Sequence, residues 1–174
     1  MHAFYNDVLP SAMEAHDHPF WKKYIQRIVE EESTPRQHPV LFEEFMNSCG
    51  IARREPDQAA LSYSRSLREG YTADLPFAAG YALGVEVEAG YEIALLAAAL
   101  RHHFGPQLEQ TEWFKVHLAD EGEVEHARVS VEMAEDALAG GGSMDQLRAG
   151  FLHFCDDVHR FMESVHGKLG SGAQ

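Results

Sequence analysis

Apolar residues along this chain recur every three or four positions, which is the spacing of one face of an α-helix. No stretch shows the strict apolar–polar alternation of a half-buried strand. Pro- and Gly-marked turns separate the helical segments. The predicted helices span residues 19–32, 38–50, 57–69, 75–103, 111–138 and 143–165. The sequence therefore predicts one all-α bundle of about six to seven helices over residues 1–168, with a disordered tail at 169–174.

The predicted helix over residues 111–138 carries two histidines whose positions conflict with one straight helix. His117 shares a face with Phe114, whereas His126 belongs to the apolar face of the second half. Nine residues place two side chains about 180° apart on an ideal helix. Gly122 lies between them, and a kink or π-bulge there would bring both rings to the same core. Two interpretations stay open for this stretch: an interrupted metal-binding helix, or a solvated acidic surface with scattered histidines.

Acidic and histidine side chains also fall on predicted apolar faces elsewhere. Glu31 continues the apolar edge of the first helix, and His38 follows it seven positions later, across a Pro-containing turn. In the helix at 75–103, Glu88 falls at the centre of the apolar stripe, whereas Glu86 is predicted to point the opposite way. A carboxylate among apolar neighbours must be paired, protonated or bound to a cation. We therefore expect Glu88 to be the best-placed buried acid.

Two further features concern packing. Glycines within the helix at 75–103 weaken that helix, and their presence predicts close backbone approach by another element; they are Gly80, Gly84 and Gly90. The last helix carries a strict apolar stripe at spacings of three and four. His159 and Glu163 lie away from this stripe, and we expect both to be solvated.

Charge and composition narrow the classes of function. Lys and Arg number 14 against 28 Asp and Glu, which gives a net charge of −14. Such an acidic chain is a poor partner for nucleic acids and for anionic membrane surfaces. No apolar run is long enough to span a bilayer, and the first residues lack the pattern of a signal peptide. Cys49 and Cys155 form no framework, so reduced thiols and a cytoplasmic location are expected.

The acids and histidines on apolar faces form a set typical of a non-haem metal site. Mixed carboxylate and imidazole ligation suits iron or manganese and leaves coordination positions open for oxygen. The HExxH, GxGxxG, P-loop and GxSxG motifs are absent, and we assign no catalytic residue. The candidate metal ligands are Glu31, His38, Glu88, His117, Glu121, Glu123 and His126.

The order of these residues resembles the haem-oxygenase-like dimetal oxidases, relatives of the thiaminase-II and pyrroloquinoline-quinone-synthase folds. The resemblance covers most of the chain and rests on short motifs. They are WKKYIQRIVEEE leading into HPVLFEEF, then ALGVEVE, then WFKVHLADEGEVEHA, and a final helix with an aromatic stripe. The family pattern is Glu-x6-His, a lone Glu on a middle helix, and then His-x3-Asp-x2-His. Glu31 and His38 match its first part, and Glu88 matches the lone Glu.

The third part of the pattern is matched with a departure. His117 matches the first His, His126 the last, and Glu123 takes the Asp position. His117 and Glu123 are six residues apart, whereas the family has four, and Glu121 instead keeps the His-x3-acid spacing. Only about thirty residues precede Glu31, so the first one or two helices of the family are expected to be missing.

The resemblance implies a haem-oxygenase-like bundle and a metal-dependent oxidoreductase. It would use two iron ions, or iron and manganese, to activate dioxygen and oxidise a small organic substrate, with Glu88 as a bridging ligand. The aromatic residues expected to line the substrate pocket are Phe20, Tyr24, Tyr81 and Phe114. One alternative is a metal-free member of the same fold group that binds a small molecule or performs cofactor-independent chemistry; another is an interaction protein with an acidic face. We also expect a homodimer, because missing helices would leave apolar surface exposed.

Overall fold

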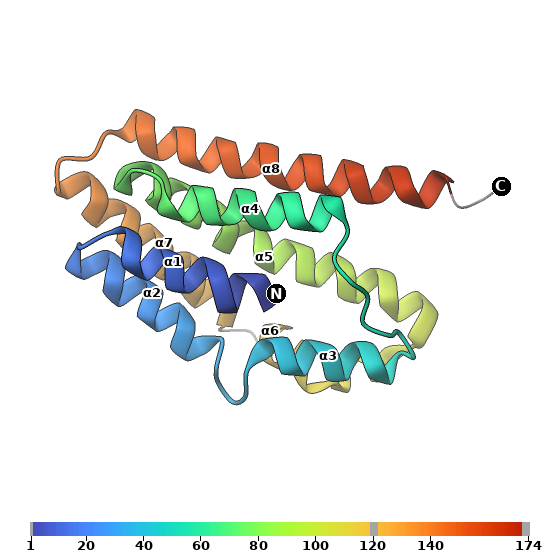
Figure 1. Cartoon of the computed structure of the whole chain (residues 1–174). Helices are drawn as coiled ribbons and strands as arrows, with labels where there is room; N and C mark the ends of the chain where they lie inside the picture. The colour runs from blue at the N-terminus through green and yellow to red at the C-terminus, as the bar shows by residue number, and fades with distance from the viewer. Residues whose placement is uncertain (1, 119–121, 172–174) are drawn as a thin grey trace.

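The protein is a bundle of helices with no strand in the part of the chain that the structure describes (Figure 1). This computed structural model describes the backbone of residues 2–118 and 122–171, and it leaves undescribed the side chains of residues 107, 122–125 and 169–171. The elements are a π-helical segment Phe4–Val8, α1 (Leu9–Ala15), α2 (Pro19–Glu31), α3 (His38–Ser48), α4 (Gln58–Thr72), α5 (Leu75–Phe104), a 3-10 segment Pro106–Gln110, α6 (Glu112–Leu118), α7 (Gly122–Ala139) and α8 (Met144–Ser171). The prediction of an all-α bundle is confirmed.

Three boundaries differ from the sequence-based prediction. The N-terminal segment Phe4–Ala15 is helical, although no helix was predicted before residue 19. Pro10 occupies the first turn of α1, where its missing N–H costs nothing. The stretch predicted as one helix over 111–138 forms two helices, with α6 ending at Leu118 and α7 beginning at Gly122. The last helix extends to Ser171, past the predicted boundary at residue 168.

Glycines end two of the helices as the sequence predicted. Gly50 follows α3 with a φ of 71°, and Gly105 follows α5 with a φ of 80°. These are left-handed conformations that cost a residue with a Cβ about 1 kcal/mol. The chain therefore turns sharply at both points, so that α3 leads into the connection to α4 and α5 leads into the 3-10 segment.

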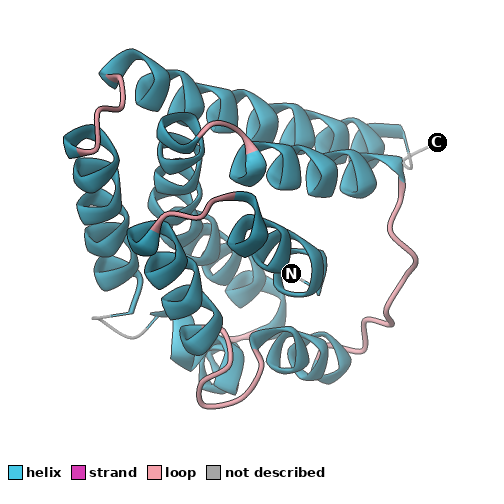
Figure 2. Cartoon of the chain, turned by 60° about the vertical axis from the view of Figure 1, so that its left-hand side comes forward, coloured by secondary structure: helices cyan, strands magenta, loops and turns pink. Residues whose placement is uncertain are grey.

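Helices α5 and α8 pack against each other at unusually close range, as the glycines predicted. A Cβ on Gly80 would lie 1.8 Å from the carbonyl oxygen of Leu147, and a Cβ on Gly150 would lie 2.0 Å from that of Phe77. Gly84 provides the space for the ring of Phe154. The absence of side chains at these positions lets the two backbones come into contact, and α5 also packs on α4, α6 and α7. Figure 2 shows the helices in a second view, with loops between them.

The buried side chains form two apolar clusters that meet at the middle of α5. The first cluster joins α1, α2, α7 and α8 to the N-terminal half of α5, as far as Val85. The second joins α3, α6 and the 3-10 segment to the C-terminal half of α5, from Ile93 onward. Glu86 lies between the two clusters on α5, and this junction positions the polar site. No helix within the described residues is long and apolar enough to cross a membrane.

Candidate functional site

Six acidic and histidine side chains gather at the junction between the two apolar clusters. They come from helices that end or begin there, and from the middle of α5. The six are Glu31 and Glu32 at the end of α2, His38 of α3, Glu86 of α5, His117 of α6 and His126 of α7. Helix ends leave backbone carbonyls without helical partners, so this junction also supplies acceptors for the histidine rings.

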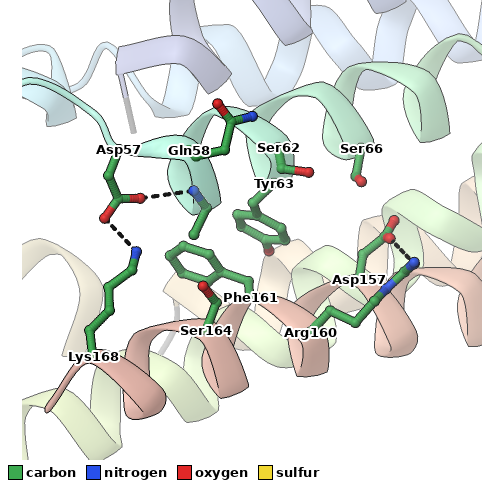
Figure 3. Close-up of a pocket in the computed structure, with 11 residues that line it drawn as sticks. Asp57, Gln58, Ser62, Tyr63, Ser66, Asp157, Arg160, Phe161, Ser164 and Lys168 are labelled. Atoms are coloured by element: carbon green, nitrogen blue, oxygen red, sulfur yellow. Dashed lines mark hydrogen bonds and ion pairs between the residues drawn. The ribbon is translucent and has the colours of Figure 1, made fainter. Parts of the chain in front are cut away.

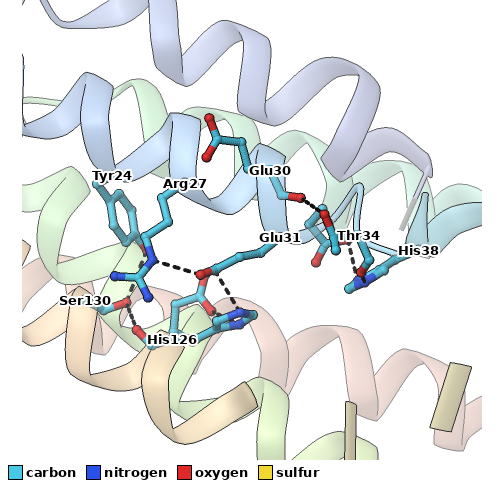
Figure 4. A network of polar contacts seen from close by, with 10 residues as sticks. Tyr24, Arg27, Glu30, Glu31, Thr34, His38, His126 and Ser130 are labelled. Atoms are coloured by element: carbon cyan, nitrogen blue, oxygen red, sulfur yellow. Dashed lines mark hydrogen bonds and ion pairs between the residues drawn. The ribbon is translucent and has the colours of Figure 1, made fainter. Parts of the chain in front are cut away.

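His126 lies between two carboxylates from different helices. Its Nε2 is 2.9 Å from Oε2 of Glu31, and its Nδ1 is 3.5 Å from Oε2 of Glu86 (Figure 4). Arg27 donates from Nε to the other oxygen of Glu31, Oε1, at 2.8 Å. Glu86 is only 7% exposed, so the pairing with His126 offsets the cost of burying this carboxylate.

His38 and His117 form a second pair of rings beside the first group. Their ring centroids are 4.6 Å apart. His38 donates from Nε2 to the carbonyl of Thr34 at 3.0 Å, and His117 donates from Nδ1 to the carbonyl of Trp113 at 2.7 Å. The second nitrogen of His38, Nδ1, is buried without a hydrogen-bond partner and lies 3.3 Å from Oε2 of Glu32. Each ring is thus fixed by a backbone carbonyl through one nitrogen, which leaves its other nitrogen as the one able to bind a ligand.

The two rings differ in their affinity for protons. Burial opposes the charged form of His38, but the carboxylate of Glu32 and the carbonyl of Thr34 outweigh it, so the pKa of His38 is raised. Burial lowers the pKa of His117, and a charge on His38 would lower it further. His117 is therefore a neutral imidazole near pH 7, which is the form that binds metals.

A buried tyrosine borders the group on the side of α2. The hydroxyl of Tyr24 lies 3.3 Å from Oγ of Ser130, which in turn donates to the carbonyl of His126 at 2.9 Å (Figure 4). Burial raises the pKa of Tyr24 well above its ordinary value, and the nearby negative charge of Glu86 adds to that effect. The raised pKa means that Tyr24 stays protonated near pH 7.

The structure corrects the predicted orientation of the two central acids of α5. Glu86 is buried and contacts His126, whereas Glu88 is only partly buried and lies beside Glu92. The predicted stripe through Glu88 is real, but it faces α8, where Gly84 of the same stripe packs on Phe154. The error arose because α5 has apolar neighbours on more than one side. Glu86 instead shares its face with Ile93 and Ala97, at spacings of seven and eleven residues, and that spacing was the available signal.

The remaining predicted ligands are placed as follows. Glu31, His38, His117 and His126 are all brought to the junction. Glu121 lies outside the described residues, and so does the side chain of Glu123. Glu32 was missed because it is adjacent to Glu31, and helical phasing assigned only one of them to the interior.

The four aromatic residues expected to line one pocket do not converge. Only Tyr24 borders the polar group. Tyr81 faces α8 and donates to the buried carboxylate of Asp157 at 2.9 Å, and Phe114 packs on Phe45 within the second apolar cluster. Phe20 packs against the first cluster. Aromatic residues on apolar faces mostly serve the core, and three of these four do so.

Comparison with protein-family models, with curated proteins and with solved structures found no match to this chain. The family resemblance therefore remains a hypothesis that rests on the short motifs alone.

In this geometry the side chains that could act as metal ligands pair with one another. Within the described residues, no three His, Cys, Asp or Glu side chains converge on a point that could hold a metal ion. Both ring nitrogens of His126 and Nδ1 of His38 lie close to carboxylates. A bound cation would have to separate the acid–imidazole pairs and take their lone pairs. The donor types fit iron or manganese, and the backbone-fixed rings fit a metal ligand.

A separate cavity of about 500 Å³ lies between α4 and α8 (Figure 3). The stacked rings of Tyr63 and Phe161, 4.6 Å apart, line its middle. An ion pair borders it on each side, Asp57 with Lys168 and Asp157 with Arg160. Three serines also line the cavity: Ser62, Ser66 and Ser164.

Proposed function

We propose that the six side chains at the junction bind iron or manganese, and that the protein is a dioxygen-activating oxidase or oxygenase of a small organic substrate. One observation supports this proposal more than any other. His38 and His117 each donate one ring N–H to a backbone carbonyl, and the remaining nitrogen of His38 is buried with the carboxylate of Glu32 3.3 Å away. Metal-binding histidines almost always show this arrangement, in which a backbone carbonyl fixes the tautomer and the orientation of the ring.

The donors divide into two sets, which is the basis for proposing two ions. Glu31, Glu86 and His126 form the first set. Glu32, His38 and His117 form the second, which contacts the first through its histidines. Iron held by mixed carboxylate and imidazole ligands supplies the redox chemistry that dioxygen activation requires.

The surrounding residues hold these donors and control their protons. Arg27 donates a hydrogen bond to one carboxylate oxygen of Glu31, and the other oxygen of Glu31 contacts His126. Burial of Glu86 and His117, each 7% exposed, keeps bulk water away and strengthens electrostatic interactions within the site. The hydroxyl of Tyr24, protonated at neutral pH, is positioned to donate a hydrogen bond toward Glu86.

Metal analysis of matched variants tests the proposal. Purified protein incubated with ferrous iron without oxygen is expected to retain about two ions per chain. Glu86→Gln and His126→Ala should each weaken iron binding by more than about 100-fold, because loss of an outer-shell partner alone costs about 10- to 100-fold. Titration followed by elemental analysis measures both.

The same helices offer matched controls. Glu88→Gln changes an acid two residues from Glu86 on α5, and His159→Ala removes an exposed histidine of α8. Both variants should bind iron as the unsubstituted protein does. If Glu88→Gln were as damaging as Glu86→Gln, or if the unsubstituted protein bound no iron, the assignment of the site would be wrong.

One observation favours a second candidate function, a metal-free small-molecule binder of the same fold. The cavity between α4 and α8 has the volume of a ligand pocket, and it lies on the α8-facing side of α5, away from Glu86. Protein that retains no iron, yet is stabilised against heat by small polar molecules through Tyr63 and Arg160, would favour this second function.

We also propose that the protein is a homodimer, because two large apolar side chains of α5 are strongly exposed, Tyr91 at 71% and Leu95 at 70%. This part of the proposal does not involve the metal site.

A further inference from the structure

The cavity between α4 and α8 is elongated, because the two helices run antiparallel along it. Asp57, at the start of α4, pairs with Lys168 near the end of α8, and further along α4 the ring of Tyr63 stacks on that of Phe161. The part of α8 that lines the cavity extends from Asp157 to Lys168. Eleven residues of helix cover about 16 Å. The cavity therefore suits a linear ligand better than a compact one.

A carboxylate is fixed at each end of this cavity (Figure 3). Asp57 is the N-cap of α4, and its Oδ1 accepts hydrogen bonds from the backbone N–H groups of Ala59 and Ala60. Asp157 is only 4% exposed, and its Oδ2 accepts a hydrogen bond from the hydroxyl of Tyr81 at 2.9 Å. Each carboxylate thus has a partner within the fold besides the cation with which it forms an ion pair.

The two cations that contact these carboxylates have exposed side chains. The side chain of Lys168 is 50% exposed, and that of Arg160 is 65% exposed. Exposed ion pairs contribute little to stability, so a ligand ammonium group can replace Lys168 beside Asp57 at little cost. A carboxylate can accept about four hydrogen bonds, so Asp157 can accept from Arg160 and from a ligand together. The ammonium and guanidinium groups already present show which chemistry both ends accept.

The middle of the cavity suits an alkyl chain that carries positive charge. The rings of Tyr63 and Phe161 provide an apolar surface for methylene groups, and the face of an aromatic ring attracts ammonium groups. The hydroxyl oxygens of Ser62, Ser66 and Ser164 can accept hydrogen bonds from N–H groups along such a chain.

The surrounding charges favour a cation over an anion. Burial raises the pKa of Tyr63, and the charges of Glu92, Glu88 and Asp157 raise it further, so these carboxylates lie close to the ring. The lining itself contains two acids and two bases, and Glu88 and Glu92 add to the acidic side. The net charge of −14 also attracts cations from solution. An anion bound here would lie near several carboxylates in an acidic protein.

We propose that this cavity binds a linear organic polyamine, with ammonium groups on Asp57 and Asp157 and the alkyl chain along Tyr63 and Phe161. Spermine, a linear tetraamine whose extended chain has a length similar to that of the cavity, is the probe. A monoamine can reach only one of the two carboxylates, and a single metal ion cannot span them. The inference goes beyond the proposed metal function and does not depend on it.

Isothermal titration calorimetry with the full chain tests the site at about 0.15 M ionic strength, where weak attraction between exposed charges is screened. We expect one spermine to bind per chain. Butylamine, which has one ammonium group, and adipate, a linear dicarboxylate, should each bind at least about 10-fold more weakly, because each lacks charged hydrogen bonds that spermine makes.

Two substitutions at one end of the cavity should act in opposite directions. Asp57→Ser keeps a good N-cap for α4 but removes the carboxylate, so it should weaken spermine binding about 10-fold. Lys168→Ala removes the ammonium group that competes for Asp57, so it should tighten spermine binding about 2- to 5-fold. Glu135→Gln and Lys23→Ala, which change exposed charges on α7 and α2, are the matched controls and should leave the affinity unchanged.

The buried end is tested by Asp157→Asn, which keeps an acceptor for the hydroxyl of Tyr81 and should weaken spermine binding about 10-fold. Circular dichroism shows whether each variant is folded. If Asp157→Asn does not fold, the two substitutions at the other end still decide the question, because both change exposed side chains.

Four results would overturn the proposal. They are no spermine binding, tighter binding of adipate than of spermine, weaker spermine binding after Lys168→Ala, and an equal loss of affinity in Asp57→Ser and Glu135→Gln. The last result would mean that the net charge alone attracts spermine. Elemental analysis of the same samples measures iron separately, so failure of this inference is distinguishable from failure of the proposed metal function.

Discussion

The paired carboxyls of Glu88 and Glu92 on α5 should make the stability of the protein depend on pH. Burial, together with the charge and the hydrogen bond of Glu92, raises the pKa of Glu88 from 4.5 to about 7. A carboxyl whose pKa is higher in the folded state favours folding when protonated. Its contribution is complete below about pH 4.5, and it is lost as the pH rises through about 7.

Replacing Glu88 by Gln removes this loss of stability at high pH. A carboxyl pKa raised from 4.5 to about 7 corresponds to about 3 kcal/mol in the free energy of unfolding. Glu88 is partly exposed, and solvent screens part of this effect, so we expect about 1–2 kcal/mol. Glu88→Gln should therefore be nearly neutral near pH 4.5 and stabilising by about 1–2 kcal/mol near pH 8. In a chain of this length, the gain raises the melting temperature by about 2–8 °C.

Urea unfolding at several pH values measures this difference. Both proteins are held at the same concentration, because a dimer gains apparent stability with concentration. Glu135→Gln, an exposed acid of α7, is the matched control and should show no such trend. If the difference between Glu88→Gln and the unsubstituted protein is the same near pH 5 as near pH 8, the two carboxyls do not share a buried environment.

Two further predictions concern packing along α8. Gly150→Ala should lower the free energy of unfolding by about 3 kcal/mol, since its Cβ would meet the backbone of Phe77. Gly167→Ala is the control. Because Gly167 has open space around it, this substitution should be neutral or stabilising by about 0.5–1 kcal/mol. Phe154→Ala should cost about 3–5 kcal/mol, because its ring is buried against Gly84 and Tyr81. Leu152→Ala, half-exposed two residues earlier, should cost less than about 1 kcal/mol. Thermal and chemical unfolding measure all four variants, and equal losses at the members of either pair would contradict the packing described.

The spacing of apolar residues predicted most helices well, because the turns in this chain are marked by glycine and proline, which act directly on the local backbone. Gly50 and Gly105 end helices by adopting positive φ, and the glycines of α5 predicted its contact with α8. The same reasoning predicted no helix before residue 19, although Phe4–Val8 and Leu9–Ala15 are helical.

The candidate site was harder to predict, because which face of a helix is buried depends on its neighbours. Glu86 and Glu88 are on opposite sides of α5, and both sides carry apolar residues. The sequence contains both stripes, but only the positions of α7 and α8 show which one faces His126. The histidines were easier to assign, since His38, His117 and His126 each lie near a helix end.

The location of the polar group at the junction has a physical cause that bears on function. Three carboxylates and three imidazoles inside one apolar cluster would each lose hydration without a partner, at a cost of several kcal/mol per ion. At the junction, the carbonyls of Thr34 and Trp113 accept from His38 and His117, and Arg27 offsets the charge of Glu31. The acid–imidazole pairs then hold the remaining side chains close to one another. A fold selected only for stability would gain by replacing these pairs with apolar residues of similar volume. The number of ionisable groups gathered at this junction is therefore the feature that the proposed cation would account for.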